Sequence, residues 1–465
     1  MSPRRAIKTV GIVGGGLAGL SAACALADHG YKVTLLERRP YLGGRASSYQ
    51  HPGTGEVVDN CQHVLLGCCT NLIEFYRRLG VEEKIAWYDA LNFIEPGGRC
   101  SIIKPSLLPA PLHGLPAFAR ATFLDVADKD AIARALLRMI DGELPETDEH
   151  FLAWLERHGQ TQRAIERFWK PVLVSALNED LHHLSLRYAS QVFRESFLKS
   201  AEAGRMGIPR IPLSQLYGAA GEYLRERKGD VLLRCGVESL QALTAGITLR
   251  ASGQELHFDA VILALPFESL GQILPSSADT ETLRAKLQKF EHSPITGIHL
   301  WFDRQITDLP HAVLLERTIQ WMFNKSILQS RGSTESGSYL ELVVSSSKSM
   351  VERGRQEIIQ LALSELAEFF PGVRDAQLLK ATVIKEVHAT YSAQPGVDKH
   401  RPGSVTTSPR LFLAGDWTAT AWPATMEGAV RSGYLAAEAL TRDAGAPQKF
   451  LVADLPAKGF MRLFG

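Results

Sequence analysis

The chain has 465 residues, more than a single hydrophobic core usually supports, and this length predicts about two or three domains. Its composition, with 45% hydrophobic and 22% charged residues, is that of a globular protein and excludes a chain that is disordered throughout. A formal net charge of +1 lacks the basic excess of nucleic-acid-binding proteins, so we expect no nucleic-acid partner.

The six cysteines give no sign of a metal site. They include no CxxC pair, and the cluster of Cys61, Cys68 and Cys69 lacks zinc-ligand spacing. Scattered thiols in a chain of this size are typical of a reducing compartment. We therefore expect buried structural cysteines, no metal and a cytoplasmic protein.

The first motif is a strand, a turn, a helix and a second strand. Thr9–Val13 and Tyr31–Leu36 are short apolar runs typical of buried parallel strands. Leu17–His29, which is rich in Ala and Leu, predicts the helix between them, and Gly30 is its expected end. This order of elements is that of a dinucleotide-binding unit.

Three glycines and one acidic residue place the dinucleotide in this unit. Gly14 permits the tight turn, Gly16 lets the backbone approach the pyrophosphate, and Gly19 lets the helix pack closely. The amides of the first helical turn would face the phosphates, and Glu37 can accept hydrogen bonds from ribose hydroxyls. The cofactor-binding residues predicted here are Gly14, Gly16, Leu17, Ala18, Gly19 and Glu37.

A second glycine pair follows in the segment from Arg38 through Gly43 and Gly44 to Arg45. This segment resembles the second glycine pair of the amine oxidase and phytoene desaturase flavoproteins. The resemblance implies that the dinucleotide is FAD rather than NAD, and that Gly44 and Arg45 run beside its pyrophosphate and ribityl chain. Arg38 and Gly43 are predicted to contact the cofactor as parts of the same segment.

Two apolar runs in the middle of the chain, Val231–Val237 and Asp259–Pro266, predict further strands of the nucleotide domain. In the flavoproteins that the chain resembles, a valine backbone in the first of these strands pairs with the adenine edge. The resemblance implies this role for Val237. A core valine is the alternative interpretation, and both can hold.

The C-terminal stretch resembles the second FAD signature of the same flavoproteins. Leu411–Asp416 predicts an apolar strand that ends in Gly415 and Asp416, and a helix with small residues follows it. The resemblance implies that Asp416 hydrogen-bonds the ribityl or phosphate region. It also implies that the helix start, near Met426 and Glu427, points backbone amides at the flavin pyrimidine, where a helix N-terminus stabilises the negative charge of the reduced ring.

Together these segments predict an α/β protein, with a Rossmann-like FAD-binding domain that is discontinuous in sequence and an inserted mixed α+β substrate domain, as in the amine oxidases. The FAD-binding domain is assigned to 1–75, 206–266 and 395–465. The substrate-binding domain, with a helical membrane-facing part, is assigned to 76–205 and 267–394. Helices are expected over 128–140, 149–158 and 161–177, and strands over 295–302, 339–345 and 381–390.

Two segments could touch a membrane. Ser101–Leu124 is apolar but contains four prolines, which exclude a regular spanning helix. It is either a patch that enters the bilayer surface and admits a lipid or a buried irregular lid. Lys458–Phe464 combines apolar and basic residues, as either a membrane-touching tail or a docked terminus would. We expect peripheral contact at the inner face of the plasma membrane.

Two segments of the sequence resemble one particular family among these flavoproteins. Val58–Cys68 resembles the segment after the Gly-Gly-Arg motif in the squalene-associated, FAD-dependent hydroxysqualene dehydroxylases of bacterial hopanoid synthesis. Gly415–Thr418 and Pro423–Gly433 resemble their C-terminal block. Two residues depart from the pattern: Cys61 stands where glycine is expected, which argues against a close backbone approach to the flavin, and Cys69 stands where an aromatic residue is common.

The resemblance implies that hydroxysqualene, a long apolar isoprenoid, is reduced to squalene with loss of water. An allylic hydroxyl leaves once protonated, and reduced flavin can deliver hydride to the resulting cation, so the site must supply an acid and exclude water. His63 and Asp59 are the candidate catalytic residues, because their segment is expected to pass near the isoalloxazine. His63 could instead pack against the flavin without proton transfer. Glu427 is a further candidate acid, with a structural role as its alternative.

A single GxGxxG motif predicts no second nicotinamide-binding domain, so we expect an external electron donor. Three other functions stay open. A carotenoid- or phytoene-type desaturase or isomerase would share fold and cofactor but pass hydride to oxidised flavin. An amine oxidase would line its site with aromatic side chains. A non-catalytic isoprenoid carrier would share the fold alone.

Overall fold

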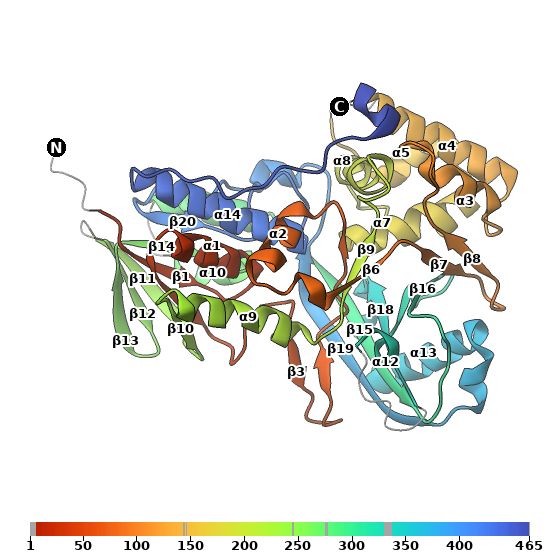
Figure 1. The fold of residues 1–465 in the computed structure, drawn as a ribbon, viewed down its shortest axis with the longest axis horizontal. Coiled ribbons are helices and arrows are strands. Elements are labelled where there is room, and N and C mark those ends of the chain that lie inside the picture. The colour runs from red at the N-terminus through yellow and green to blue at the C-terminus, as the bar shows by residue number, and fades with distance from the viewer. Residues whose placement is uncertain are drawn as a thin grey trace.

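The structure is a computed structural model that describes residues 6–142, 145, 147–243, 246–274, 278–329 and 337–464. Figure 1 shows two lobes, one with a parallel sheet and the N-terminal segment, the other with a mostly antiparallel sheet and a group of helices above it. The C-terminal segment crosses from the first lobe to the second. Both lobes are therefore assembled from distant parts of the sequence.

A five-stranded parallel sheet forms the centre of the first lobe, in the order β10-β2-β1-β14-β20. Its strands come from three separate stretches of the chain, as a discontinuous domain requires, although the predicted domain boundaries stay a prediction. The strands are β1 (Thr9–Val13), β2 (Lys32–Glu37), β10 (Asp230–Leu233), β14 (Ala260–Leu263) and β20 (Leu411–Leu413).

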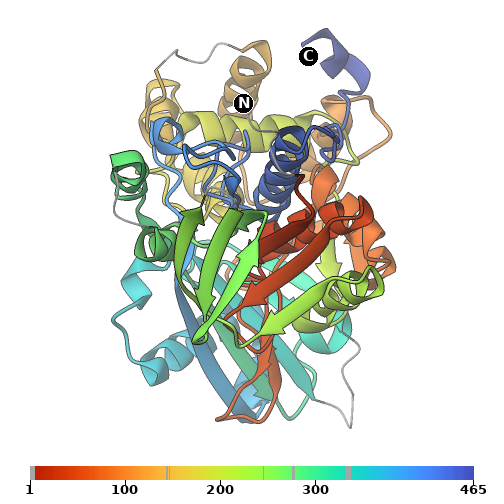
Figure 2. The same cartoon turned by 90° about the vertical axis from the view of Figure 1, so that its left-hand side faces the viewer.

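The predicted strand over Val231–Val237 is confirmed only for its first half, which is β10 of the parallel sheet. β10 ends at Leu233, because Arg234 adopts a left-handed backbone conformation with φ 56° that breaks the extended run. Val237 instead begins a separate antiparallel sheet of order β11-β12-β13, which Figure 2 shows beside the parallel sheet. Its strands are β11 (Val237–Leu243), β12 (Gly246–Ala251) and β13 (Gln254–Phe258).

Helices made of small residues cover the parallel sheet. Every residue of α1 from Leu17 to Ala27 is buried, and α14 packs along it (Figure 1). The approach is close: a Cβ atom on Gly433 would lie 2.2 Å from the carbonyl oxygen of Ala18. The helices around this sheet are α1 (Leu17–Asp28), α2 (Thr70–Arg78), α9 (Leu213–Glu226) and α14 (Met426–Asp443).

A seven-stranded sheet forms the base of the second lobe, in the order β19-β15-β18-β17-β16-β7-β8. It contains the three strands predicted over 295–302, 339–345 and 381–390, which are confirmed. The strands are β7 (Leu91–Ile94), β8 (Cys100–Ile103), β15 (His292–Phe302), β16 (His311–Leu314), β17 (Trp321–Asn324), β18 (Ser338–Ser345) and β19 (Leu378–Tyr391).

The predicted helices over 128–140 and 149–158 are confirmed as α4 and α5. The predicted helix over 161–177 is interrupted by a wider π-turn at Ile165–Trp169. Pro171 explains this, because it cannot donate a backbone hydrogen bond and its ring crowds the preceding turn. The helices here are α3 (Leu115–Arg120), α4 (Val126–Asp141), α5 (Phe151–Arg157), α6 (Gln162–Ala164), α7 (Lys170–Leu177) and α8 (Leu186–Val192).

The remaining elements are short or connect the lobes. They are β3 (Ser48–Gln50), β4 (Val57–Asp59), β5 (Leu65–Leu66), β6 (Ile85–Tyr88), β9 (Met206–Pro209), α10 (Phe267–Ile273), α11 (Ala278–Leu287), α12 (Lys325–Leu328) and α13 (Arg355–Phe369). Within the described ranges, no helix has both the length and the apolar character needed to cross a membrane.

Candidate functional site

A cavity of about 410 Å³ opens where the segments predicted to bind the cofactor meet. It lies at the carboxyl ends of the parallel strands, where open α/β sheets bind their ligands. The predicted cofactor residues on its wall are Gly14, Gly16, Leu17, Ala18, Glu37, Arg38, Gly43, Gly44, Arg45, Val237, Gly415, Asp416 and Met426. The other two, Gly19 and Glu427, lie behind the wall.

The first turn after β1 has no room for side chains. Gly14 has φ 107°, and a Cβ atom there would lie 2.4 Å from the Ala264 carbonyl oxygen. A Cβ atom on Gly19 would lie 1.9 Å from the Gly14 carbonyl oxygen, so the helix packs directly on the turn. By contrast, a Cβ atom on Gly16 would meet only Gly44, at 3.8 Å. Gly16 therefore borders open space of the kind that a pyrophosphate needs.

The second glycine pair lies against the first. Gly43 N–H donates to the Gly15 carbonyl at 2.8 Å, and Gly16 and Gly43 form an isolated parallel bridge. A Cβ atom on Gly44 would come within 2.9 Å of the Gly16 Cα atom. The two loops thus form one cradle of backbone atoms, which fits the diphosphate of a dinucleotide.

The N-terminus of α1 leaves its amides available to a ligand. Gly16 occupies the capping position and has no side chain to accept hydrogen bonds, and the first turn carries no acidic residue. The first amides of a helix otherwise lack intrahelical partners and attract anions. Leu17 and Ala18, which begin the helix, are both on the cavity wall.

Glu37 ends β2 and fixes the neighbouring turn. Its Oε2 accepts a hydrogen bond from Gly15 N–H at 2.7 Å, and its Oε1 accepts one from Arg39 N–H at 2.7 Å. The carboxylate is buried yet borders the cavity. Each oxygen keeps a further lone pair, so binding of ribose hydroxyls stays a prediction that this position permits.

An ion pair joins the N-terminal and C-terminal parts of the site. Arg45 Nη2 lies 2.7 Å from Asp416 Oδ1, and Arg45 Nη1 donates to the Ala389 carbonyl at 2.8 Å. Burial alone would lower the pKa of Arg45, but the charge and hydrogen bond of Asp416, together with the charges of Glu268 and Glu386, raise it overall. The two predicted halves of the cofactor site are therefore in direct contact.

Met426 and Glu427, the first two residues of α14, have side chains in different surroundings. Met426 borders the cavity, but the Glu427 side chain points away from it and is fully buried. Its carboxylate accepts hydrogen bonds from Leu72 N–H at 2.8 Å and from Asn71 Nδ2 at 2.9 Å, and it pairs with Arg431 at 3.2 Å. The Glu427 side chain therefore caps α2, which supports the structural alternative rather than a role as acid.

The segment from Asn60 to Val64 forms another part of the wall. The Nδ1 atom of His63 lies 2.8 Å from the Cys61 carbonyl oxygen, so this nitrogen carries the proton and Nε2 is left as acceptor. Burial lowers the pKa of His63, and the carbonyl bond only partly opposes this. At neutral pH the ring is thus uncharged.

Asp59 does not reach the cavity wall, contrary to its selection as a candidate acid. Its Oδ2 pairs with Lys325 Nζ at 2.7 Å, and its Oδ1 accepts hydrogen bonds from Ser48 Oγ and Leu213 N–H. Burial would raise the pKa of Asp59, but the attraction of Lys325 and these hydrogen bonds lower it to about 2. The lowered pKa favours the ionised form of Asp59, which does not suit the predicted role of proton donor.

Sequence reasoning missed the buried charges behind this wall. Lys325 is 1% exposed and contacts Asp59, Gln62 Oε1 at 2.8 Å and Glu341 Oε2 at 3.3 Å. Burial raises the pKa of Glu341 to about 7 in spite of the nearby lysine. No local pattern marks these residues, because the lysine and its partner aspartate are 266 positions apart. The one local sign of a buried charge is the acidic residue Glu341 within the otherwise uncharged strand β18.

Comparison with known proteins identifies the family. The model of the flavin-containing amine oxidoreductases matches residues 17–441. The chain is 29% identical over 458 residues to 15-cis-phytoene desaturase of Synechococcus elongatus, covering 93% of this chain and 95% of that protein. It is 27% identical over 470 residues to zeta-carotene desaturase of Zea mays, covering 91% and 82%.

Among solved structures, cyclohexylamine oxidase from Brevibacterium oxydans superposes with a TM-score of 0.68 at 17% identity, over 95% of this chain and 100% of that chain. Identity this low supports the fold alone. The predicted Rossmann-like α/β fold is thus confirmed, and the family match confirms FAD as the cofactor of an oxidoreductase. The chain belongs to the flavin-containing amine oxidoreductases.

Proposed function

We propose that the protein catalyses the reductive dehydroxylation of hydroxysqualene to squalene. The observation that carries this proposal is the position of the Gln62–His63 segment, which resembles that of the hydroxysqualene dehydroxylases and lies on the wall of the cofactor cavity. The phytoene and zeta-carotene desaturases named above support an isoprenoid substrate in kind. They do not distinguish removal of a hydroxyl from desaturation.

The reaction breaks one allylic C–O bond and forms one C–H bond. The hydroxyl oxygen takes up a proton and leaves as water, and the carbon then receives a hydride. FAD, when bound and reduced, supplies that hydride, and an external donor restores the two electrons. The protein must protonate the oxygen and keep water from the cation.

His63 is the residue of this chain that we assign to the proton. Its Nδ1 donates to the Cys61 carbonyl oxygen at 2.8 Å, which fixes the ring and leaves Nε2 as the nitrogen that can take up and release a proton. Because burial keeps the resting ring neutral, Nε2 must first take up a proton from solvent, and the lowered pKa then favours its transfer to the substrate hydroxyl. Packing against the flavin without proton transfer is the alternative, and a variant distinguishes the two.

The described wall of the cofactor cavity lacks the aromatic rings that were expected of an amine oxidase. Among the described residues, none that lines the cavity carries a phenyl, phenol or indole ring. Aromatic rings facing a small cationic substrate were the feature expected of an amine oxidase. Apolar contacts come instead from aliphatic side chains such as Val64, Ile273 and Ile295.

The deciding experiment presents two substrates separately. Protein loaded with FAD is reduced without oxygen and mixed with hydroxysqualene, and squalene and flavin reoxidation are measured. The oxidised protein is incubated in parallel with phytoene. Squalene formation supports the proposal. Desaturated phytoene without squalene would replace the proposal with a desaturase, and inactivity on both would remove it.

The His63→Gln variant tests the assigned proton. We expect normal FAD content with squalene formation reduced about 100-fold or more, the range of general acid catalysis. The matched control is His182→Gln, which changes an exposed histidine and should leave the rate unchanged. If His63→Gln forms squalene at nearly the rate of the unaltered protein, His63 only packs against the flavin and does not transfer the proton.

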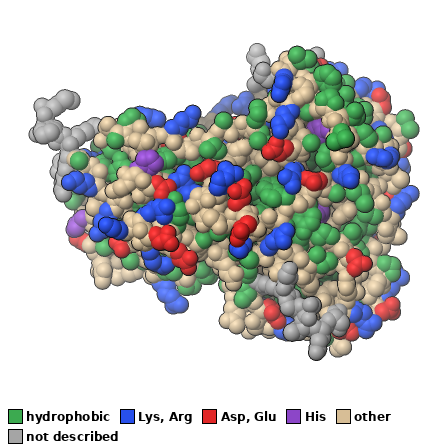
Figure 3. All heavy atoms as spheres, viewed as in Figure 1, with side chains coloured by type: hydrophobic (Ala, Val, Ile, Leu, Met, Phe, Trp, Pro, Cys, Tyr) green, Lys and Arg blue, Asp and Glu red, His purple; other side chains and the backbone are tan. Residues whose placement is uncertain are grey.

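We further propose that the protein contacts an anionic membrane surface. The two apolar segments singled out in the sequence meet, since Phe460 N–H donates to the Ala110 carbonyl at 2.8 Å. Figure 3 shows hydrophobic side chains gathered in this region, at the upper right. The exposed large apolar residues of the two segments are Ile102, Leu107, Leu108, Leu112, Leu115, Phe460, Leu463 and Phe464. The exposed charged residues among them are the basic Lys104, Arg120, Lys458 and Arg462.

Exposed leucines with basic residues around them fit the boundary between acyl chains and anionic headgroups. We expect the protein to sediment with vesicles that contain phosphatidylglycerol and less with pure phosphatidylcholine. The double variant Leu107→Glu, Leu463→Glu should lose most of this binding. Leu379→Glu, which changes an exposed leucine of β19, is the control. Equal sedimentation of all three proteins would exclude this surface.

A further inference from the structure

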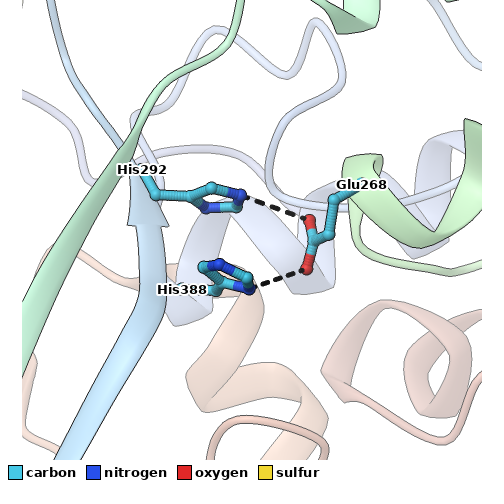
Figure 4. A group of neighbouring side chains, drawn as sticks. All are labelled: Glu268, His292 and His388. Atoms are coloured by element: carbon cyan, nitrogen blue, oxygen red, sulfur yellow. Dashed lines mark ion pairs between the residues drawn. The ribbon is translucent and has the colours of Figure 1, made fainter.

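Two imidazoles and one carboxylate from three different elements converge beside the cavity (Figure 4). Glu268 lies in the first turn of α10, His292 begins β15, and His388 lies on β19. Strands β15 and β19 pair with a break in register between Ser293 and Ile295, next to His292. The two histidine rings stack with centroids 4.0 Å apart and planes 20° apart.

The three side chains do not satisfy one another. His292 Nε2 lies 3.9 Å from one oxygen of Glu268, and His388 Nδ1 lies 3.9 Å from the other. Hydrogen bonds of this type measure about 2.7–3.2 Å, so both contacts are too long. The three donor atoms nevertheless all lie within 4.8 Å of one another.

This gap is close to what a metal ion requires. Zn²⁺ binds histidine nitrogen at about 2.0–2.1 Å and carboxylate oxygen at about 2.0–2.2 Å, which places tetrahedral ligand atoms roughly 3.3–3.5 Å apart. Each donor would need to move by about 1 Å or less. The side chains of Glu268 and His388 are 31% and 53% exposed and can rotate toward His292, which is 23% exposed and stacked on Phe267 with ring centroids 4.5 Å apart.

We infer that Glu268, His292 and His388 bind a divalent transition-metal ion of the zinc type. Two imidazoles and one carboxylate are a donor set that Zn²⁺ accepts, whereas Ca²⁺ and Mg²⁺ prefer oxygen donors. Imidazole nitrogens ligate metal ions in their neutral form, and the donor atoms of the two rings both face the Glu268 carboxylate. Arg45, a cation that interacts with Glu268, is already paired with Asp416 at 2.7 Å.

An ion here would join the two lobes. α10 follows β14 of the parallel sheet, while His292 and His388 belong to the seven-stranded sheet. Ser269 and Ala389, the residues that directly follow Glu268 and His388, line the cofactor cavity. Bound metal would therefore hold the rim of this cavity, and it would raise the unfolding temperature because it binds only the folded arrangement.

The test uses tag-free, FAD-loaded protein stripped of metal with a chelator and titrated with Zn²⁺ by calorimetry. We expect one ion per chain at this site, no heat with Ca²⁺, and a higher unfolding temperature with Zn²⁺. The variants His388→Ala and Glu268→Gln should each bind at least tenfold more weakly. His182→Ala, which removes an exposed histidine elsewhere, is the control and should bind as the unaltered protein does.

Co²⁺ supplies an independent readout, because its visible spectrum distinguishes nitrogen and oxygen ligands from thiolate. We expect a spectrum without thiolate charge transfer that is lost in His388→Ala. Flavin absorbance per chain confirms that each variant is folded. The inference is overturned if the stripped protein binds no Zn²⁺, if both variants bind like the control, or if the Co²⁺ spectrum shows thiolate ligands, which would assign binding to cysteines.

Discussion

Two walls of the cofactor cavity are built in different ways. The wall around Gly14, Gly16 and Gly44 consists of backbone atoms from two loops that touch because no Cβ atom stands between them. The wall from Asn60 to Val64 is held from behind by side chains, with Lys325 bridging Asp59 and Gln62. The first wall depends on glycines, which have no Cβ atom to separate the loops. The second wall depends on a buried ion pair and its hydrogen bonds.

The difference decides how each wall responds to change. A buried ion pair is a weak source of net stability, but removal of one partner leaves an unpaired charge in a low-dielectric interior. A Cβ atom added to a crowded glycine forces the backbone that it meets to shift, and overpacking of this kind costs about 1–3 kcal/mol. The wall held by charges should therefore be the more sensitive of the two to a single substitution.

The largest effect is expected for Lys325→Met, which leaves Asp59 without its cation. Removal of one partner of a buried pair costs about 3–5 kcal/mol. We expect a marked fall in the thermal unfolding midpoint of the FAD-loaded protein, together with reduced flavin content. Lys380→Met is the matched control, because Lys380 pairs with Glu56 at the surface, where such pairs contribute about 0–1 kcal/mol. Similar midpoints for the two variants would show that the buried cluster does not hold the wall.

The next effect concerns pH and Glu341. Because the folded protein raises the pKa of this group to about 7, from an ordinary value of 4.5, it retains a proton that the unfolded chain has lost. The free energy of unfolding should therefore fall as pH rises from about 4.5 to 7, by about 2–4 kcal/mol. Glu341→Gln removes this titration, so its stability profile should lack that decline.

Other groups do not obscure this comparison. His292 and His311, whose pKa values are lowered to about 4, make stability rise over part of the same range, but they do so equally in both proteins. The difference between the two unfolding profiles, measured from pH 4.5 to 8, isolates Glu341. Glu56→Gln, at the surface, serves as control. Parallel profiles for Glu341→Gln and the unaltered protein would show that Glu341 does not titrate in this range.

The same contrast between local backbone geometry and long-range side-chain contacts decides which features the sequence predicts. The unit from Thr9 to Glu37 was predictable, because strand periodicity and glycine positions are local rules. Val231–Val237 was mistaken for one strand because composition does not show that Arg234 turns left-handed. Asp59 was mistaken for an acid because its cation is 266 positions away. Local rules predict backbone geometry, whereas protonation depends on long-range contacts.

The buried carboxylate of Glu427 illustrates the same limit. The role of the Glu427 backbone amide toward the flavin stays a prediction, but its side-chain oxygens accept hydrogen bonds from the first turn of α2, 355 positions earlier in the chain. A helix that lacks a capping side chain of its own, as α2 does at Cys69, takes its cap from elsewhere. Sequence shows the uncapped helix and the acidic residue separately, but not that they meet.

The smallest effect on stability is expected at the glycine wall. In Gly19→Ala the added Cβ atom would lie 1.9 Å from the Gly14 carbonyl oxygen, so α1 must shift away from the turn. Overpacking of this kind costs about 1–3 kcal/mol. Because the same shift moves the first amides of α1, flavin content should fall with stability. Gly218→Ala on α9 is the matched control, since a Cβ atom there meets nothing within 4 Å and alanine favours a helix. If Gly19→Ala keeps its flavin and unfolds at the same temperature as Gly218→Ala, close packing of helix on turn is not what shapes the cofactor wall.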